Sequence, residues 1–182
     1  PEMARALNAP LCAHARGGCG SAADAAAVPP PPPAGGHPFP ATAFYLDQGL
    51  RRLQRVATSM RDAPPPELWR GVRSLRLTDG FVAYGYTELG ASSCTTQLRA
   101  AALAAVGPDA LLLKFSERQG GLRAADLRFL SCYPAEAEHV WPPMTHLQPT
   151  GNMEVVRLPA LGDAKFTVVE VEPRAASARH TM

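Results

Sequence analysis

Three short stretches of the sequence combine residue types that can act on an anionic substrate. The first is an apolar run over residues 68–72 that contains Arg70 and, beside it, Gly71. A guanidinium is costly to bury without an anionic partner, and its fork of N–H groups suits a phosphate or a carboxylate. Gly71 would let a ligand approach the backbone closely. An arginine at a strand edge, paired with a structural carboxylate, is the alternative interpretation.

The second stretch, residues 88–96, is rich in small hydroxyl side chains. Ser93 and Thr95 belong to it, and such side chains can line a pocket and hydrogen-bond a ligand or orient a carboxylate. An edge strand running into a helix at Gln97 would use the same residues, with Thr95 or Thr96 as the helix cap. The two interpretations are compatible.

The third stretch holds two carboxylates, Glu136 and Glu138, between two predicted strands. In an extended segment their side chains point the same way. Like charges that lie close together raise the pKa of one group, which makes it a usable acid or base. A solvated acidic turn is the alternative. The similar pair Glu170 and Glu172 is interpreted as the outward face of an alternating strand.

The elements that must position these residues are read from periodicity. Apolar residues at helical spacing predict a helix over residues 44–60, and an alanine-rich helix is predicted over 97–106. The remaining signals are β-like runs, at residues 68–75, 81–86, 91–96, 110–116, 126–131, 139–141, 144–147, 154–158 and 166–172. This order predicts an α+β fold with a helical start followed by a mostly antiparallel sheet.

The chain is expected to divide into three parts. Residues 1–43 form an N-terminal segment with a short helix over 1–16 and a proline-rich insertion, in which residues 29–33 are all proline. Residues 44–174 form the main domain, and residues 175–182 form a tail. Because the chain begins with Pro1 and not Met, we expect it to be a piece of a longer protein.

Composition excludes several classes of function. A net charge of +2 over 182 residues argues against a nucleic-acid binder. The sequence contains no apolar run of about 18 residues, so no membrane span is predicted. The 4 cysteines lack zinc-ligand spacing, so no metal site is expected. The compartment is left open, with the cytoplasm favoured.

In order along the chain, these stretches resemble the mono-ADP-ribosyltransferases of the arginine–serine–glutamate type. The resemblance covers about residues 44–173. It rests on Trp69-Arg70-Gly71 for the family's strand arginine, Ser93-Cys94-Thr95 for its Ser-Thr-Ser strand, Glu136-Ala137-Glu138 for its Glu-x-Glu turn, and Pro142-Pro143 for the proline pair that follows. Cys94 departs from the family's usual threonine, which puts fine contacts to the ribose in doubt.

The resemblance implies a fold with N-terminal helices and a two-sheet, mostly antiparallel β core, and it makes residues 44–174 the ADP-ribosyltransferase domain. It implies NAD as the substrate, with release of nicotinamide and transfer of ADP-ribose to an arginine of an acceptor protein. The resemblance implies that Glu138 holds the ribose hydroxyl and stabilises the developing cation, that Glu136 acts on the acceptor guanidinium, and that Ser93 positions Glu138 or the ribose. It further implies that Arg70 binds a phosphate and that Gly71 and Thr95 make further contacts to NAD. Tyr133 is implied to guide the protein substrate.

Two other functions use the same residues. An NAD glycohydrolase would pass ADP-ribose to water, and a non-catalytic module would only bind NAD. Cys94 and Cys132 are interpreted as buried thiols, with a redox-sensitive pair at the NAD site as the alternative. His139 is expected at a pocket rim or in solvent, and Trp141 is expected to be structural.

Overall fold

The computed structural model describes residues 40–59, 66–73, 77–107, 110–116 and 122–175. The short helix and the proline-rich insertion predicted before residue 40 lie outside these ranges, as does most of the predicted tail. The described elements, in chain order, are α2 (Pro40–Ser59), β1 (Leu68–Val72), α3 (Asp79–Tyr84), β2 (Tyr86–Glu88), β3 (Ser92–Thr95), α4 (Leu98–Ala105), β4 (Leu111–Phe115), β5 (Ala125–Asp126), η1 (Pro134–Glu136), β6 (Glu138–Trp141), β7 (Thr145–Leu158), η2 (Pro159–Leu161) and β8 (Ala164–Ala175).

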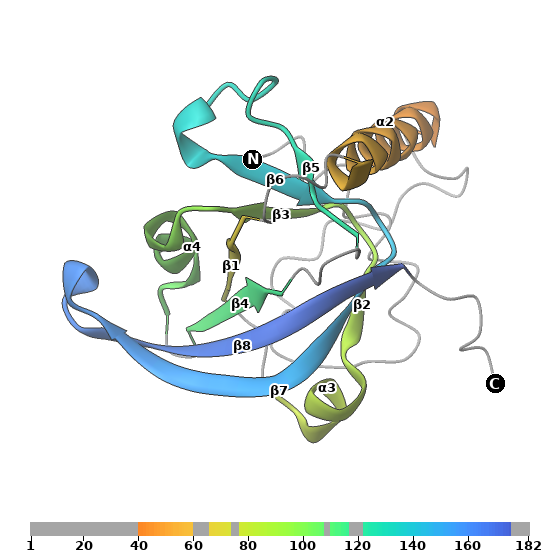
Figure 1. Ribbon diagram of the computed structural model, residues 1–182. Coiled ribbons are helices and arrows are strands. Elements are labelled where there is room, and N and C mark those ends of the chain that lie inside the picture. Colours follow the sequence, from red (N-terminus) through yellow and green to blue (C-terminus); the bar gives the residue numbers. More distant parts are fainter. Residues whose placement is uncertain (1–39, 60–65, 74–76, 108–109, 117–121, 176–182) are drawn as a thin grey trace, which may run out of the picture.

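The strands form one 8-stranded sheet in the order β2-β7-β8-β4-β1-β3-β6-β5. The β4–β8 pair is parallel, and the other strand pairs described are antiparallel. The expectation of two sheets is therefore wrong. The reason is a junction between β1 and β3, where the single residue pair Trp69↔Thr95 joins β3, β5 and β6 to the other strands (Figure 1).

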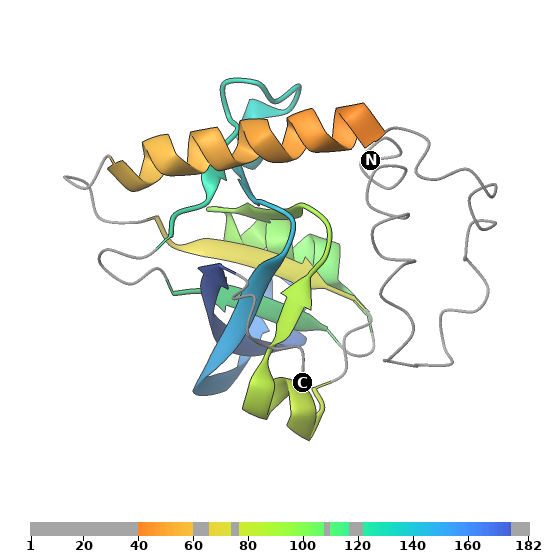
Figure 2. The ribbon, with the colours of Figure 1, turned by 90° about the vertical axis from the view of Figure 1, so that its right-hand side faces the viewer.

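The two faces of the sheet are covered differently because strand residues alternate between them. Leu111, Leu113 and Phe115 of β4 face a core that also contains Trp141 and Val169. Leu112 faces the other way, toward the alanines of α4. Helix α2 packs through Leu50 on Ala125 and Val140 of β5 and β6 (Figure 2). Trp141 is fully buried and stacks on Phe115, which confirms its structural role.

The helices predicted over residues 44–60 and 97–106 are present, as α2 and α4. Most of the predicted strands are present too, and the runs at 144–147 and 154–158 belong to one long strand, β7. Glu170 and Glu172 alternate with the buried Val169 and Val171, as expected of an outward face.

Two predicted strands are wrong for local reasons. Residues 81–86 are mainly helix α3, because the hydroxyl of Thr78 accepts a hydrogen bond from the Phe81 N–H at 3.1 Å and caps the helix. Residues 126–131 leave the strand after Asp126, whose carboxylate accepts a hydrogen bond from the Arg128 N–H at 3.0 Å. Such local side-chain bonds compete with strand pairing.

Candidate active site

The three sequence motifs come together on neighbouring strands. Arg70 lies on β1, Ser93 on β3 and Glu138 on β6, and these strands are consecutive in the sheet. The residues lie on both sides of the Trp69↔Thr95 junction. Strand alternation places the Arg70 side chain on the Ser92 side of the sheet, whereas Ser93 and Glu138 point to the other side.

Arg70 is held by three partners around its guanidinium. Its Nη1 donates to the Ser92 hydroxyl and to the Ser93 carbonyl oxygen, the latter at 3.3 Å. Its Nη2 lies 3.2 Å from Glu88 Oε1. Arg70 is thus paired with a carboxylate, as the alternative interpretation expected, but β1 lies between β4 and β3 and is not an edge strand. A guanidinium has five N–H donors, so Nε and one N–H of Nη2 remain for a ligand, and the side chain is 26% exposed.

Tyr86 completes this network from β2. Its hydroxyl donates to Glu88 Oε1 at 2.8 Å. Burial raises the pKa of the Tyr86 hydroxyl far above its ordinary value, and the Glu88 charge raises it further. Tyr86 therefore stays protonated and holds the carboxylate that holds Arg70. The sequence analysis did not identify Tyr86 or Ser92 as site residues. Alternation along residues 92–95 places Ser92 on the side opposite Ser93, and this pattern could have drawn Ser92 into the prediction.

Gly71 lies against helix α4. A Cβ at this position would be 2.0 Å from the Ala101 carbonyl oxygen and 2.8 Å from the Ala105 backbone nitrogen. Close helix packing thus requires a glycine here without any ligand. The predicted contact of Gly71 with NAD stays a prediction.

Ser93 and Glu138 share one face of the β3–β6 pair. The register places Ser93 opposite Val140 and Thr95 opposite Glu138. Ser93, Thr95 and Glu138 therefore point to the same side, which is the side of Val140, where α2 packs. Ser93 is exposed and Glu138 is half-buried, so both are open to a ligand.

The two glutamates of the Glu-x-Glu turn do not lie in one extended segment, so strand alternation does not place their side chains on the same side. Glu136 ends the short helix η1, and Glu138 begins β6. Between them, Ala137 adopts a left-handed conformation with φ 48°. Glu136 is exposed and lies in a turn whose backbone is not that of a strand.

Thr95 and Gln97 hold this turn from the end of β3. The Thr95 hydroxyl donates to the Glu136 carbonyl oxygen at 2.6 Å and accepts from the Gln97 N–H at 2.9 Å. The Gln97 side-chain amide donates to the Ala135 carbonyl oxygen. Gln97, and not Thr95 or Thr96, is the N-cap residue of α4. The predicted contact between Thr95 and NAD stays a prediction.

The segment before the turn presents large apolar side chains to solvent. Phe129, Leu130 and Tyr133 are 68%, 66% and 66% exposed. Tyr133 starts the turn, with its N–H donating to the Ser131 hydroxyl at 3.0 Å. A side chain so exposed is accessible to another macromolecule.

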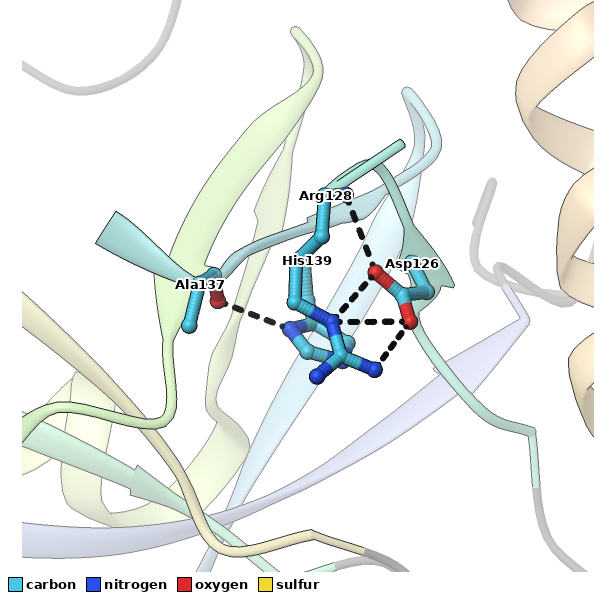
Figure 3. Close-up of polar contacts among 4 residues, drawn as sticks. All are labelled: Asp126, Arg128, Ala137 and His139. Carbon is cyan, nitrogen blue, oxygen red and sulfur yellow. Dashed lines mark hydrogen bonds and ion pairs between the residues drawn. The ribbon is translucent and has the colours of Figure 1, made fainter. Parts of the chain in front are cut away.

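His139 is buried, contrary to expectation, with 5% of its surface exposed. It faces Asp126 across the β5–β6 pair, and its Nδ1 lies 3.0 Å from the Ala137 carbonyl oxygen (Figure 3). Cys94 is buried as expected, and its thiol donates to the His139 carbonyl oxygen at 3.3 Å. Cys132 is exposed, so the expectation that it is buried is wrong.

A cavity of about 320 Å³ lies between α2 and the turn from β6 to β7. Its cationic lining is Arg51, which is held by Asp47 and by the Pro143 carbonyl oxygen, and Arg55. Within the described residues Arg55 has no ion-pair partner. Gln54 also lines the cavity and is 8% exposed, and its side chain has no hydrogen bond to any described residue.

The described residues contain no cluster of three or more histidine, cysteine, aspartate or glutamate side chains placed to hold a metal ion. Among the helices in the described ranges, none has the length and hydropathy to cross a membrane.

Comparison with known proteins gives matches at the level of structure. Neither a scan against family models nor a search of curated proteins found a match. The ADP-ribosyltransferase HopU1 of Pseudomonas syringae pv. tomato DC3000 is similar with a TM-score of 0.52 and 22% identity, over 73% of this chain and 54% of HopU1. The chain thus spans about half the length of HopU1.

Two ADP-ribosyltransferase toxins resemble the chain more distantly. Plx2a of Paenibacillus larvae has a TM-score of 0.45 and 14% identity, over 75% of this chain and 82% of the toxin. Vis of Vibrio splendidus has a TM-score of 0.43 and 20% identity, over 79% of this chain and 65% of the toxin. On the likeness to HopU1, this chain has the fold of an ADP-ribosyltransferase.

Proposed function

We propose that this chain is a mono-ADP-ribosyltransferase that moves ADP-ribose from NAD to an arginine of an acceptor protein. The observation that carries the proposal is the placement of Arg70, Ser93 and Glu138 on the consecutive strands β1, β3 and β6. The fold shared with HopU1 supports it. No metal is required for this chemistry.

The proposed reaction breaks the bond between the nicotinamide nitrogen and the ribose. The bonding electrons leave with nicotinamide, and the ribose develops oxocarbenium character. A fixed carboxylate beside that carbon stabilises the developing cation. Glu138 is proposed for this role because it is half-buried and shares a strand face with Ser93. The acceptor guanidinium then forms the new bond to the ribose and loses a proton to Glu136.

The anionic part of NAD needs cations. Arg70 offers its two remaining N–H donors to a phosphate. The cavity beside α2 supplies Arg51 and Arg55, and its lining residue Thr145 pairs with Glu88, the partner of Arg70. We therefore assign the diphosphate of NAD to the space between Arg70 and this cavity. Tyr133 and Glu136 are exposed on the turn, where an acceptor protein could reach them.

The test is incubation with labelled NAD and a small guanidino acceptor. Glu138→Gln should lower nicotinamide release on the order of 10²–10³-fold, the usual cost of losing one electrostatic contact to a transition state. Glu154→Gln, an exposed glutamate of β7, is the matched control and should keep full activity. Full activity in Glu138→Gln would contradict the mechanism. Free ADP-ribose as the sole product would favour an NAD glycohydrolase, and NAD binding without nicotinamide release would favour a non-catalytic module.

A further inference from the structure

The backbone of the Glu-x-Glu turn is fastened at five consecutive carbonyl oxygens, those of residues 135–139. The donors, in order of the accepting residue, are Gln97 Nε2, Thr95 Oγ1, His139 Nδ1, the Leu127 N–H and Cys94 Sγ. Four of the five donors are side chains, whereas about two-thirds of protein hydrogen bonds join backbone to backbone. This part of the chain is thus held mostly by side chains outside the strand ladder.

The two glutamates depend on these bonds to different degrees. Glu138 is in β6 and is paired with Thr95 of β3, and its carbonyl oxygen accepts from the Leu127 N–H at 3.0 Å. Strand pairing alone therefore fixes its backbone. Glu136 lies outside the strands, and its position relative to Glu138 depends on Ala137.

Ala137 is the strained residue of the turn. Its φ of 48° lies in the left-handed region, which is unfavourable for a residue with a Cβ. Such a conformation persists only when its surroundings impose it. Here Ala137 is 9% exposed, and its carbonyl oxygen accepts from His139 Nδ1 at 3.0 Å. A carbonyl oxygen can only accept, so Nδ1 carries the proton.

The His139 ring is itself fixed by its surroundings. Asp126 lies opposite it in the β5–β6 pair, and Arg128 holds the Asp126 carboxylate with Nε at 3.0 Å and Nη2 at 2.6 Å (Figure 3). The Arg128 guanidinium keeps the pKa of Asp126 below its usual range. The ring is thus buried beside a carboxylate whose own position is set by an ion pair.

We infer that Gln97, Thr95 and His139 are positioning residues that set Glu136 relative to Glu138 and so commit the site to a guanidino acceptor in place of water. The inference rests on the proposed function. We call the hydrogen bonds that Gln97, Thr95 and His139 donate to the turn the clamp. Loosening the clamp displaces Glu136 and leaves Glu138 in its strand. Transfer to the acceptor should therefore fall while cleavage of NAD continues.

The experiment compares two variants that remove a donor with little change in size, Gln97→Met and His139→Leu. A misplacement of about 1 Å can cost about 10²-fold, so we expect a loss of that order in kcat/KM for the guanidino acceptor. Nicotinamide release without acceptor should stay at the wild-type rate. His139→Asn, whose amide can place an N–H near the position of Nδ1, should restore transfer. Loss of both activities together, or of neither, would overturn the inference.

Hydrogen exchange separates this inference from the proposed function. The Glu136 and Ala137 N–H groups donate within the turn, to Tyr133 O at 2.9 Å and Pro134 O at 3.1 Å. Both should exchange faster in Gln97→Met than in wild type, and unchanged exchange would contradict the clamp. Wild-type protein that releases no nicotinamide would refute the proposed function, whereas the exchange measurement still decides whether the clamp exists.

Discussion

Replacing Gly71 by alanine asks whether this glycine serves helix packing or the approach of a ligand. The added Cβ would stand 2.0 Å from the Ala101 carbonyl oxygen and 2.8 Å from the Ala105 nitrogen. Both atoms belong to the α4 backbone, which cannot rotate away as the end of a side chain can. Overpacking costs about 1–3 kcal/mol, and contact with rigid backbone puts Gly71→Ala at the upper end.

For a chain of this length, about 3 kcal/mol corresponds to a fall in Tm of roughly 6–12 °C. Gly49→Ala is the matched control, because nothing lies within 4 Å of a Cβ built at this exposed position of α2. Alanine is the better helix former by about 0.5–1 kcal/mol, so this variant should gain roughly 1–4 °C.

The assay is thermal unfolding by circular dichroism, with NAD affinity measured by calorimetry well below both midpoints. Opposite shifts in Tm for the two variants are the expected result. An unchanged Tm in Gly71→Ala together with weaker NAD binding would refute the packing argument and favour a role in ligand approach.

Three further predictions concern the proposed site. Arg70→Lys keeps the charge but loses the fork, so it should weaken NAD binding roughly 10- to 150-fold by calorimetry, since a charged hydrogen bond is worth about 1.5–3 kcal/mol; equal affinity would contradict the phosphate contact. Arg55→Ala should raise the Kd for NAD and flatten its dependence on salt, whereas Arg52→Ala, exposed on the same helix, should do neither. The raised pKa of Tyr86 means that its contribution to stability is fully present below about pH 10 and is lost as the pH rises further. Tm scans from pH 8 to 11 should therefore show a smaller alkaline loss in Tyr86→Phe than in wild type, and parallel curves would count against burial of the hydroxyl beside Glu88.

Long periodic segments and residue chemistry were predictable from the sequence. The helices α2 and α4 and the central strands follow from apolar spacing and composition, which are properties of the segments themselves. A partner for Arg70 was predictable, because a guanidinium in an apolar run needs one. The identity of that partner was not predictable, because Glu88 lies on β2, which is not paired with β1, and only the arrangement of the whole sheet brings it to Arg70.

The failures have local causes. A single cap at Thr78 places residues 81–84 in a helix, and one carboxylate at Asp126 ends a strand. His139 is buried because β5 pairs with β6. The spacing of residues along the sequence therefore gives no sign of the hydrogen bond between His139 and Ala137. Gln97 lay outside every motif, and only the position of α4 brings its amide to the turn.

The junction at Trp69↔Thr95 has a mechanical consequence. Among the residues that the structure describes, backbone pairing between the two parts of the sheet is confined to this one residue pair, so the junction is expected to act as a hinge between two stiffer plates. Arg70 belongs to one plate and Glu138 to the other. A substrate that contacts both Arg70 and Glu138 would stiffen the hinge, so the sheet would bend less while the substrate is bound.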